Sequence, residues 1–139
     1  MQKVSDLMTR QPATLPTSAT VVEAAQRMRD MDIGAVVVID GDERLCGIVT
    51  DRDIVVRAVA EGNSIARMQL DALCTRDVMT LSPDDDADQA VHMMRDKAVR
   101  RVPVTSNGKL LGMLSLGDLA VARDPGSALG QISSARPNH

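Results

Sequence analysis

The chain repeats itself, and this duplication limits its possible folds more than any other feature of the sequence. When the sequence is shifted by 66 residues, Thr9-Arg10 falls on Thr75-Arg76, and Met28-Arg29-Asp30 falls on Met94-Arg95-Asp96. After a one-residue deletion in the turn near Asp42, the shift becomes 65. Gly47 then matches Gly112, Thr50 matches Ser115, and Asp53 matches Asp118. A register held over so many positions predicts two copies of one supersecondary unit.

Both copies predict the same order of elements: helix, strand, helix, strand, strand, helix. Thr20 and Glu23 have capping-box spacing at the start of a helix, and the runs after it are β-branched. In the first copy we expect a helical turn at 4–8, strands at 13–15, 33–39 and 45–49, and helices from Thr20 and over 53–60. In the second we expect a strand near 80–81, strands at 99–105 and 110–114, and helices at 86–96 and 118–123. Hairpin turns are expected at Asp40-Gly41-Asp42 and Asn107-Gly108.

The repeat also predicts how the chain is divided. We expect a first domain over residues 4–62, a connection over 63–69 and a second domain over 70–123. The remaining stretch, 124–139, contains Pro, Gly, Ser and Asn, and we expect a mostly irregular tail with Leu129 and Ile132 as anchors. The fold class is therefore α/β (α+β).

Composition excludes several functions. The chain has no Phe, Tyr or Trp, and its formal net charge is −3. Single-strand and RNA binders stack bases on aromatic rings, and DNA binders need a basic stripe, so nucleic-acid binding is disfavoured. The N-terminus lacks a signal pattern, and no apolar run approaches the roughly 20 residues of a membrane span. We expect a soluble, cytoplasmic protein.

Chemistry-bearing residues gather at the corner between the last strand and last helix of each copy. These corners are Gly47-Ile48-Val49-Thr50-Asp51-Arg52-Asp53 and Gly112-Met113-Leu114-Ser115-Leu116-Gly117-Asp118. The hydroxyl at such a corner could donate to a phosphate at the helix N-terminus, and the carboxylate could accept both hydroxyls of a ribose. The alternative is a plain N-cap, with the aspartate in the first turn. One corner alone favours the cap, whereas two equivalent corners favour a ligand site.

This order of elements, with the corner motif in both copies, resembles the CBS (cystathionine β-synthase) domain, and two copies in tandem resemble a Bateman module. The resemblance covers about residues 4–123. The stretches 33–38 and 99–104 resemble small stand-alone bacterial CBS-pair proteins, some linked to stress or hypoxia. It implies two CBS domains related by pseudo-two-fold symmetry, each a small three-stranded sheet packed on helices. It also implies a non-catalytic regulatory, energy-sensing module.

The resemblance also implies ligands. In that family, two clefts between the repeats hold AMP, ADP, ATP or related adenosyl ligands, with adenine among apolar strand residues and ribose on the motif aspartate. Carried over, the first cleft uses Thr14, Ile33, Ala35, Val36, Thr50 and Asp53, and the second uses Thr80, Val99, Arg101, Val102, Ser115 and Asp118.

Basic residues distinguish the two copies. Arg100-Arg101 stands where the first copy has Gly34-Ala35, and related nucleotide-sensing CBS domains place basic side chains there against phosphate. The alternative for these arginines is pairing with Asp96 or the 84–86 acidic run. Arg52 could serve a phosphate in the first copy. We expect both clefts to be competent and the second to be tighter, with Mg²⁺ as an optional companion of the nucleotide.

The remaining candidates point away from catalysis. No Ser-His-Asp set, zinc-protease motif, Walker loop or dinucleotide fingerprint is present, so we expect no enzyme and no metal site. We interpret Asp84-Asp85-Asp86 as helix-start acids, His92 as a surface residue, and Cys46 and Cys74 as reduced, packed thiols.

The resemblance implies two kinds of partner. Family members associate through helices, so we expect a homodimer. We expect the chain either to act on a separate effector protein, or to buffer or sense ligand as a dimer. The alternative function is a dimeric interaction or redox and stress-response module without nucleotide binding.

Overall fold

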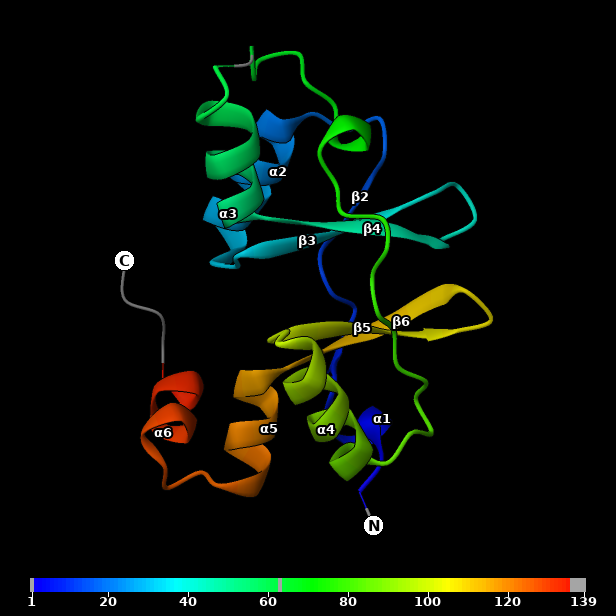
Figure 1. Ribbon diagram of the computed structural model, residues 1–139, viewed down its shortest axis with the longest axis vertical. Coiled ribbons are helices and arrows are strands. Elements are labelled where there is room, and N and C mark those ends of the chain that lie inside the picture. The colour runs from blue at the N-terminus through cyan, green and yellow to red at the C-terminus, as the bar shows by residue number, and fades with distance from the viewer. Residues whose placement is uncertain (1, 63, 136–139) are drawn as a thin grey trace. The chain divides into compact units, whose positions relative to one another are not determined.

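The computed structural model describes residues 2–62 and 64–135, which form two compact units (Figure 1). One unit contains residues 12–78, and we call it the first-repeat unit. The other contains the described residues up to Gln11 together with those from Met79 onward, and we call it the second-repeat unit.

The first-repeat unit is a three-stranded sheet covered by helices. The sheet order is β2 (Thr14–Pro16), β3 (Ala35–Ile39), β4 (Leu45–Thr50), with β2 parallel and β4 antiparallel to β3. Its helices are α2 (Val21–Met31), α3 (Asp51–Asp53), the π-helical stretch η1 (Ile54–Val59) and the 3₁₀ turn η2 (Leu70–Ala72). Apolar residues of β3 and β4 pack against α2 and η1 because those faces exclude water together.

The second-repeat unit repeats this arrangement. Its sheet order is β1 (Thr9–Arg10), β6 (Lys109–Ser115), β5 (Arg101–Ser106), and both pairings are antiparallel. Its helices are α1 (Val4–Leu7), α4 (Ala87–Lys97), α5 (Leu116–Arg123) and α6 (Ala128–Ser134). Leu81 forms a parallel bridge to Val104, which places residues 80–81 where the sequence predicts a strand.

The beginnings of the two repeats are exchanged between the units. The start of the first repeat belongs to the second-repeat unit, where Thr9 pairs with Met113 and Arg10 with Gly112. The equivalent segment of the second repeat belongs to the first-repeat unit, where Thr75 pairs with Ile48. The compact units therefore divide the chain differently from the sequence repeats.

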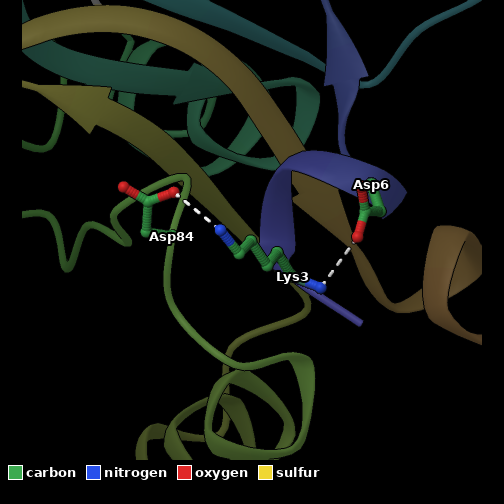
Figure 2. Close-up of polar contacts among 3 residues, drawn as sticks. All are labelled: Lys3, Asp6 and Asp84. Atoms are coloured by element: carbon green, nitrogen blue, oxygen red, sulfur yellow. Dashed lines mark hydrogen bonds and ion pairs between the residues drawn. The ribbon is translucent and has the colours of Figure 1, made fainter. Parts of the chain in front are cut away.

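Polar contacts also hold the N-terminal segment in the second-repeat unit. The backbone N–H of Lys3 donates to Asp6 at 3.0 Å, and Lys3 Nζ lies 3.5 Å from Asp84 Oδ1 (Figure 2). The N–H of Val4 donates to the carbonyl of Asp85 at 2.9 Å. Residues 3–6 are thereby fastened to the loop that precedes α4.

Two glycines allow the exchanged segments to approach the sheets closely. A Cβ on Gly47 would lie 2.5 Å from the carbonyl oxygen of Thr75, and a Cβ on Gly112 would lie 2.8 Å from that of Thr9. Non-bonded heavy atoms prefer about 3.5–4.0 Å, so neither position has room for a side chain. The glycine that opens each corner motif thus serves backbone packing.

Two expectations of local structure were wrong. The stretch after Arg123 contains a helix that the sequence did not predict, α6, which Ser127 caps by accepting the N–H of Gly130 at 3.0 Å. Leu129 and Ile132 do not anchor it, because both are exposed, whereas Gly130 is buried against the backbone of residues 120–125. Figure 1 shows α6 beside α5. Residues 136–139 lie outside the described part of the chain.

The second difference concerns the first hairpin. Asp40, Gly41 and Asp42 do join β3 and β4, but the left-handed residue is Glu43, with φ of 62°. Asp40 Oδ1 accepts the N–H groups of Asp42 and Arg44 at 2.9 and 3.0 Å, which favours a three-residue loop over a two-residue Asp-Gly turn. In the second hairpin, Asn107 and Gly108 both have positive φ, as the sequence predicts.

Candidate functional site

The first-repeat corner joins β4 to α3 through a reciprocal pair of hydrogen bonds. Thr50 Oγ1 accepts the N–H of Asp53 at 3.1 Å, and the N–H of Thr50 donates to Asp53 Oδ2 at 2.9 Å. This is a capping box, so both side chains complete the helix start. Both are half-buried, and the described residues offer Asp53 Oδ1 no hydrogen-bond partner.

The second-repeat corner has the same geometry. Ser115 Oγ accepts the N–H of Asp118 at 3.0 Å, and the N–H of Ser115 donates to Asp118 Oδ2 at 3.0 Å. The N-cap that the sequence left as an alternative is therefore present in both copies. A cap occupies one side of the carboxylate only, so it does not exclude a ligand on the other side.

The strand next to each corner brings the other candidates close to it. Ala35 is the cross-strand partner of Thr50, and Arg101 is the partner of Ser115. Residues one position earlier accept a backbone hydrogen bond from the corner: Asp51 N–H donates to Gly34 at 3.0 Å, and Leu116 N–H donates to Arg100 at 2.8 Å. Hence the arginine pair stands beside the Ser115 corner, and both arginines are exposed.

The apolar candidates divide into reachable and enclosed side chains. Thr14, Ile33 and Ala35 are half-buried, and Thr80 and Val99 are exposed. Val36 and Val102 are fully enclosed in the cores of their units, so only their main chain could touch a ligand. Thr14 lies on β2 and pairs with Val37 of β3, and Thr80 immediately precedes the bridge from Leu81 to Val104.

Charge differs between the corners. In the first-repeat unit, Asp51 Oδ1 accepts the N–H of Arg52 at 2.8 Å, and the Asp51 carboxylate lies over Gly34, 3.2 Å from where a Cβ would stand. The second-repeat corner has Leu116 at the position of Asp51 and Arg100 at that of Gly34. The first corner therefore carries a carboxylate, Asp51, next to Arg52, whereas the second carries the guanidinium groups of Arg100 and Arg101.

Sequence reasoning missed one residue at the second corner. Thr9, from the exchanged N-terminal segment, places its hydroxyl 3.4 Å from both carboxylate oxygens of Asp118. Its repeat equivalent, Thr75, makes no such bond to Asp53 within the described residues. The only available signal was the match of Thr9 to Thr75, which does not reveal which unit each threonine joins.

The two thiols belong to the first-repeat unit. Cys74 is buried, Cys46 is half-buried, and neither forms a disulfide. Burial raises the pKa of the Cys74 thiol, and Asp71 and Cys46 raise it further, while Arg76 opposes them. A raised thiol pKa lowers the fraction of reactive thiolate.

The remaining polar candidates have structural partners. Asp84 pairs with Lys3, Asp85 Oδ2 accepts the N–H of Ser82 at 2.8 Å, and Asp86 caps α4. His92 is exposed on α4. Within residues 2–62 and 64–135, no three His, Cys, Asp or Glu side chains converge in a way that could hold a metal ion, and no helix is long and apolar enough to cross a membrane.

Known proteins with the same architecture match nearly the whole chain. YlbB of Bacillus subtilis is 40% identical over 138 residues, covering 96% of this chain and 93% of that protein. The crystal structure of Hypoxic Response Protein I with two coordinated zinc ions is 31% identical, with a TM-score of 0.78, and covers 86% of this chain and 97% of that one. Hypoxic response protein 1 is known from Mycobacterium tuberculosis.

A more distant structure carries adenosyl ligands. The CBS domain pair of MJ0100, in complex with 5′-methylthioadenosine and S-adenosyl-L-methionine, has a TM-score of 0.76 and covers 86% of this chain and 94% of that one. At 24% identity, the likeness concerns the fold. The family model of the CBS domain matches residues 4–59 and again residues 70–124. The two sheets, the two corners and these matches together make the chain a member of the CBS domain family, with two CBS domains in tandem.

Proposed function

We propose that this CBS pair is a non-catalytic regulatory module that binds an adenine nucleotide, AMP, ADP or ATP, or a related adenosyl ligand, and reports it to an effector protein. One observation carries the proposal. The same hydroxyl and carboxylate pair stands at the same strand-to-helix corner twice, and each carboxylate keeps accessible surface after capping its helix.

The chain offers a partner for each part of such a ligand. A ribose diol would donate to Asp53 or Asp118, whose carboxylates are half-exposed acceptors. A phosphate would meet the Thr50 or Ser115 hydroxyl, with Arg52 at the first corner and Arg100 and Arg101 at the second. The adenine would lie along apolar strand residues. In the first repeat these are Ile33, Ala35 and the main chain at Val36, together with Thr14. In the second repeat they are Val99 and the main chain at Val102, together with Thr80.

The second corner would be the tighter site for a phosphorylated ligand. Arg101 is directly opposite Ser115, so a phosphate on that hydroxyl lies within reach of a guanidinium fork. At the first corner, the Asp51 carboxylate stands over Gly34 and repels the same phosphate. Mg²⁺ would relieve that repulsion for ADP and ATP, because it neutralises the polyphosphate.

Calorimetric titration of the nucleotide-stripped protein tests this function. The probes are AMP, ADP and ATP, each with and without Mg²⁺, and S-adenosylmethionine. Asp118→Asn tests the second corner, because an amide oxygen can still accept the Ser115 N–H and keep the cap. Arg101→Ala tests the phosphate contact. Arg95→Ala is its matched control, since Arg95 is an exposed arginine paired with Asp96 on α4.

The outcomes separate the two functions. Saturable binding of AMP that Asp118→Asn and Arg101→Ala weaken at least tenfold, and Arg95→Ala leaves unchanged, supports the proposal; tenfold corresponds to about 1.4 kcal/mol. An absence of heat with every probe would refute it and leave the dimeric interaction module. The redox version of that alternative is disfavoured by the burial of Cys74.

We also propose that the protein forms a homodimer through the η1 face. Val55, Val56 and Val59 all lie on the short segment η1, and they are 58%, 44% and 54% exposed. In the second-repeat unit, the equivalent helix α5 is covered by α6. The first-repeat helix has no such cover among the described residues, and a second copy would supply it.

Light scattering with size-exclusion chromatography tests the dimer. Val56→Glu should shift the protein toward the monomer, because a carboxylate would be desolvated in the interface. Leu111→Glu is the control, since Leu111 is 39% exposed on β6 of the other unit. Dissociation by both variants, or by neither, would contradict the η1 face as the interface.

A further inference from the structure

The N-terminal segment supplies a hydroxyl to the second-repeat corner. Thr9 lies on β1, which pairs with β6 at Met113, two residues before Ser115. Its Oγ1 stands 3.4 Å from Oδ1 and 3.4 Å from Oδ2 of Asp118, a long three-centre hydrogen bond. Thr9 is exposed, so burial does not require this arrangement.

Counting acceptor positions shows what this hydroxyl does for a diol ligand. An ionised carboxylate has about four lone-pair positions. The N–H of Ser115 uses one on Oδ2, at 3.0 Å, and the three-centre bond from Thr9 uses one on each oxygen. The position that remains, on Oδ1, can accept one hydroxyl of a ribose. Thr9 therefore fixes the plane of the carboxylate and leaves one acceptor position for the diol.

The first corner lacks this support. Thr75 is the repeat equivalent of Thr9, and its backbone bonds to Ile48 in both directions at 3.0 Å. Its side chain makes no bond to Asp53 within the described residues. Among the described residues, only the Thr50 N–H donates to the Asp53 carboxylate, so one hydrogen bond fewer fixes its plane than at Asp118.

We propose that Thr9 is a positioning residue for the diol of an adenosyl ligand at Asp118, which makes segment Val4–Arg10 part of that site. The proposal rests on the proposed function. Because a group held in its binding orientation loses less entropy when the ligand arrives, Thr9 strengthens binding at this corner. By linkage, the ligand strengthens the docking of the segment that carries Thr9.

Four proteins test the proposal by calorimetry with AMP: wild type, Thr9→Val, Thr9→Ser and Thr75→Val. Valine has the shape of threonine without the hydroxyl, and serine restores the hydroxyl. Thr9→Val should weaken AMP binding at the second corner about three- to tenfold, the range of one ordinary hydrogen bond, because contacts of 3.4 Å are too long for the full strength of a bond to a charged group. Thr9→Ser should bind within about twofold of wild type. Thr75→Val is the matched control and should leave both affinities unchanged.

A second probe separates positioning from folding. With 2′,3′-dideoxy-AMP, which has no diol, wild type and Thr9→Val should bind equally. Amide hydrogen exchange gives an independent readout. The N–H of Val4 donates to Asp85 and the N–H of Met8 donates to Val4. AMP should slow exchange of both groups more in wild type and Thr9→Ser than in Thr9→Val.

The failures of the two proposals are distinguishable. If AMP binds in an Asp118-dependent way and Thr9→Val behaves like Thr75→Val, the positioning role is wrong and the proposed function stands. Equal losses for AMP and the dideoxy probe would also overturn it, because the effect would then be structural. If no adenosyl probe binds the wild type, both proposals fail.

Discussion

Gly47→Ala is the sharpest test of the exchanged segments. The added Cβ would stand 2.5 Å from the Thr75 carbonyl oxygen and 3.1 Å from Cys74 Sγ. The oxygen belongs to the backbone and accepts the N–H of Ile48 at 3.0 Å, while the Thr75 N–H donates back to Ile48 at 3.0 Å. Relief of the clash therefore requires the two chains to separate and both hydrogen bonds to lengthen.

The expected cost follows from these two effects. Overpacking a close contact costs about 1–3 kcal/mol. Each weakened backbone hydrogen bond costs about 0.5–1.5 kcal/mol. The free energy of unfolding should therefore fall by about 2–6 kcal/mol. Gly112→Ala should cost less, because one of its two closest contacts, at 2.7 Å, is the movable sulfur of Met8 and the Thr9 oxygen is 2.8 Å away.

Urea unfolding followed by far-ultraviolet circular dichroism measures these differences, since the chain has no tryptophan to report by fluorescence. Gly41→Ala is the control, because nothing lies within 4 Å of its Cβ position and its φ is not positive. The predicted order of loss is Gly47→Ala, then Gly112→Ala, then Gly41→Ala near zero. A Gly47→Ala protein as stable as Gly41→Ala would refute the close docking of residues 74–75.

Three further predictions concern the reactivity of the thiols, the loss of stability at acidic pH and the packing of the C-terminal helix. In native protein near neutral pH, a thiol reagent should label Cys74 far more slowly than in urea, because burial raises the Cys74 pKa; equally fast labelling would revive a redox role. Arg123 lowers the pKa of Asp88, so their pairing stabilises the fold above the ordinary carboxyl pKa, and this stability is lost as the pH falls through the lowered value. Arg123→Met should slightly reduce the slope of unfolding free energy against pH in that acidic range, because both groups are exposed. An unchanged slope would contradict the pairing. Gly130→Val should detach α6 and speed proteolysis after Arg123, whereas Ile132→Val, on the exposed face, should not; equal proteolysis of the two variants would contradict the packing of α6 through Gly130.

Much of the fold was predictable because the duplication tests each assignment twice. The helices that begin after Thr20 and Asp86, the two hairpins and the two corners all lie where periodicity and turn residues place them. Those signals involve residues close together in the chain, so one sequence is enough to recognise them. Helix α6 was missed because Pro125 and Gly126 read as a loop, while the cap at Ser127 and the small Gly130 carry little pattern.

The site was predictable in kind and incomplete in detail. The capping geometry of Thr50 and Asp53 follows from their spacing, and the duplicate corner repeats it. Thr9 was missed because its contact with Asp118 joins residues 109 positions apart. Only the three-dimensional exchange of the repeat beginnings brings such residues together, and sequence matching aligns Thr9 with Thr75 without showing it.

The exchange also determines what the smallest working piece of this chain is. A fragment cut at the repeat boundary, from residue 64 onward, would keep Ser115 and Asp118 but lose β1, the outer strand of its own sheet, and with it Thr9. It would also lack Val4, whose side chain is buried in the core of the second-repeat unit, and the missing side chain would leave a cavity there. The second corner is therefore complete only when both repeats are present, even though every residue of its motif comes from one repeat. A ligand held at Asp118 is in this way coupled, through Thr9, to the first residues of the chain. Occupancy of a site in one repeat can therefore change how well ordered a segment of the other repeat is.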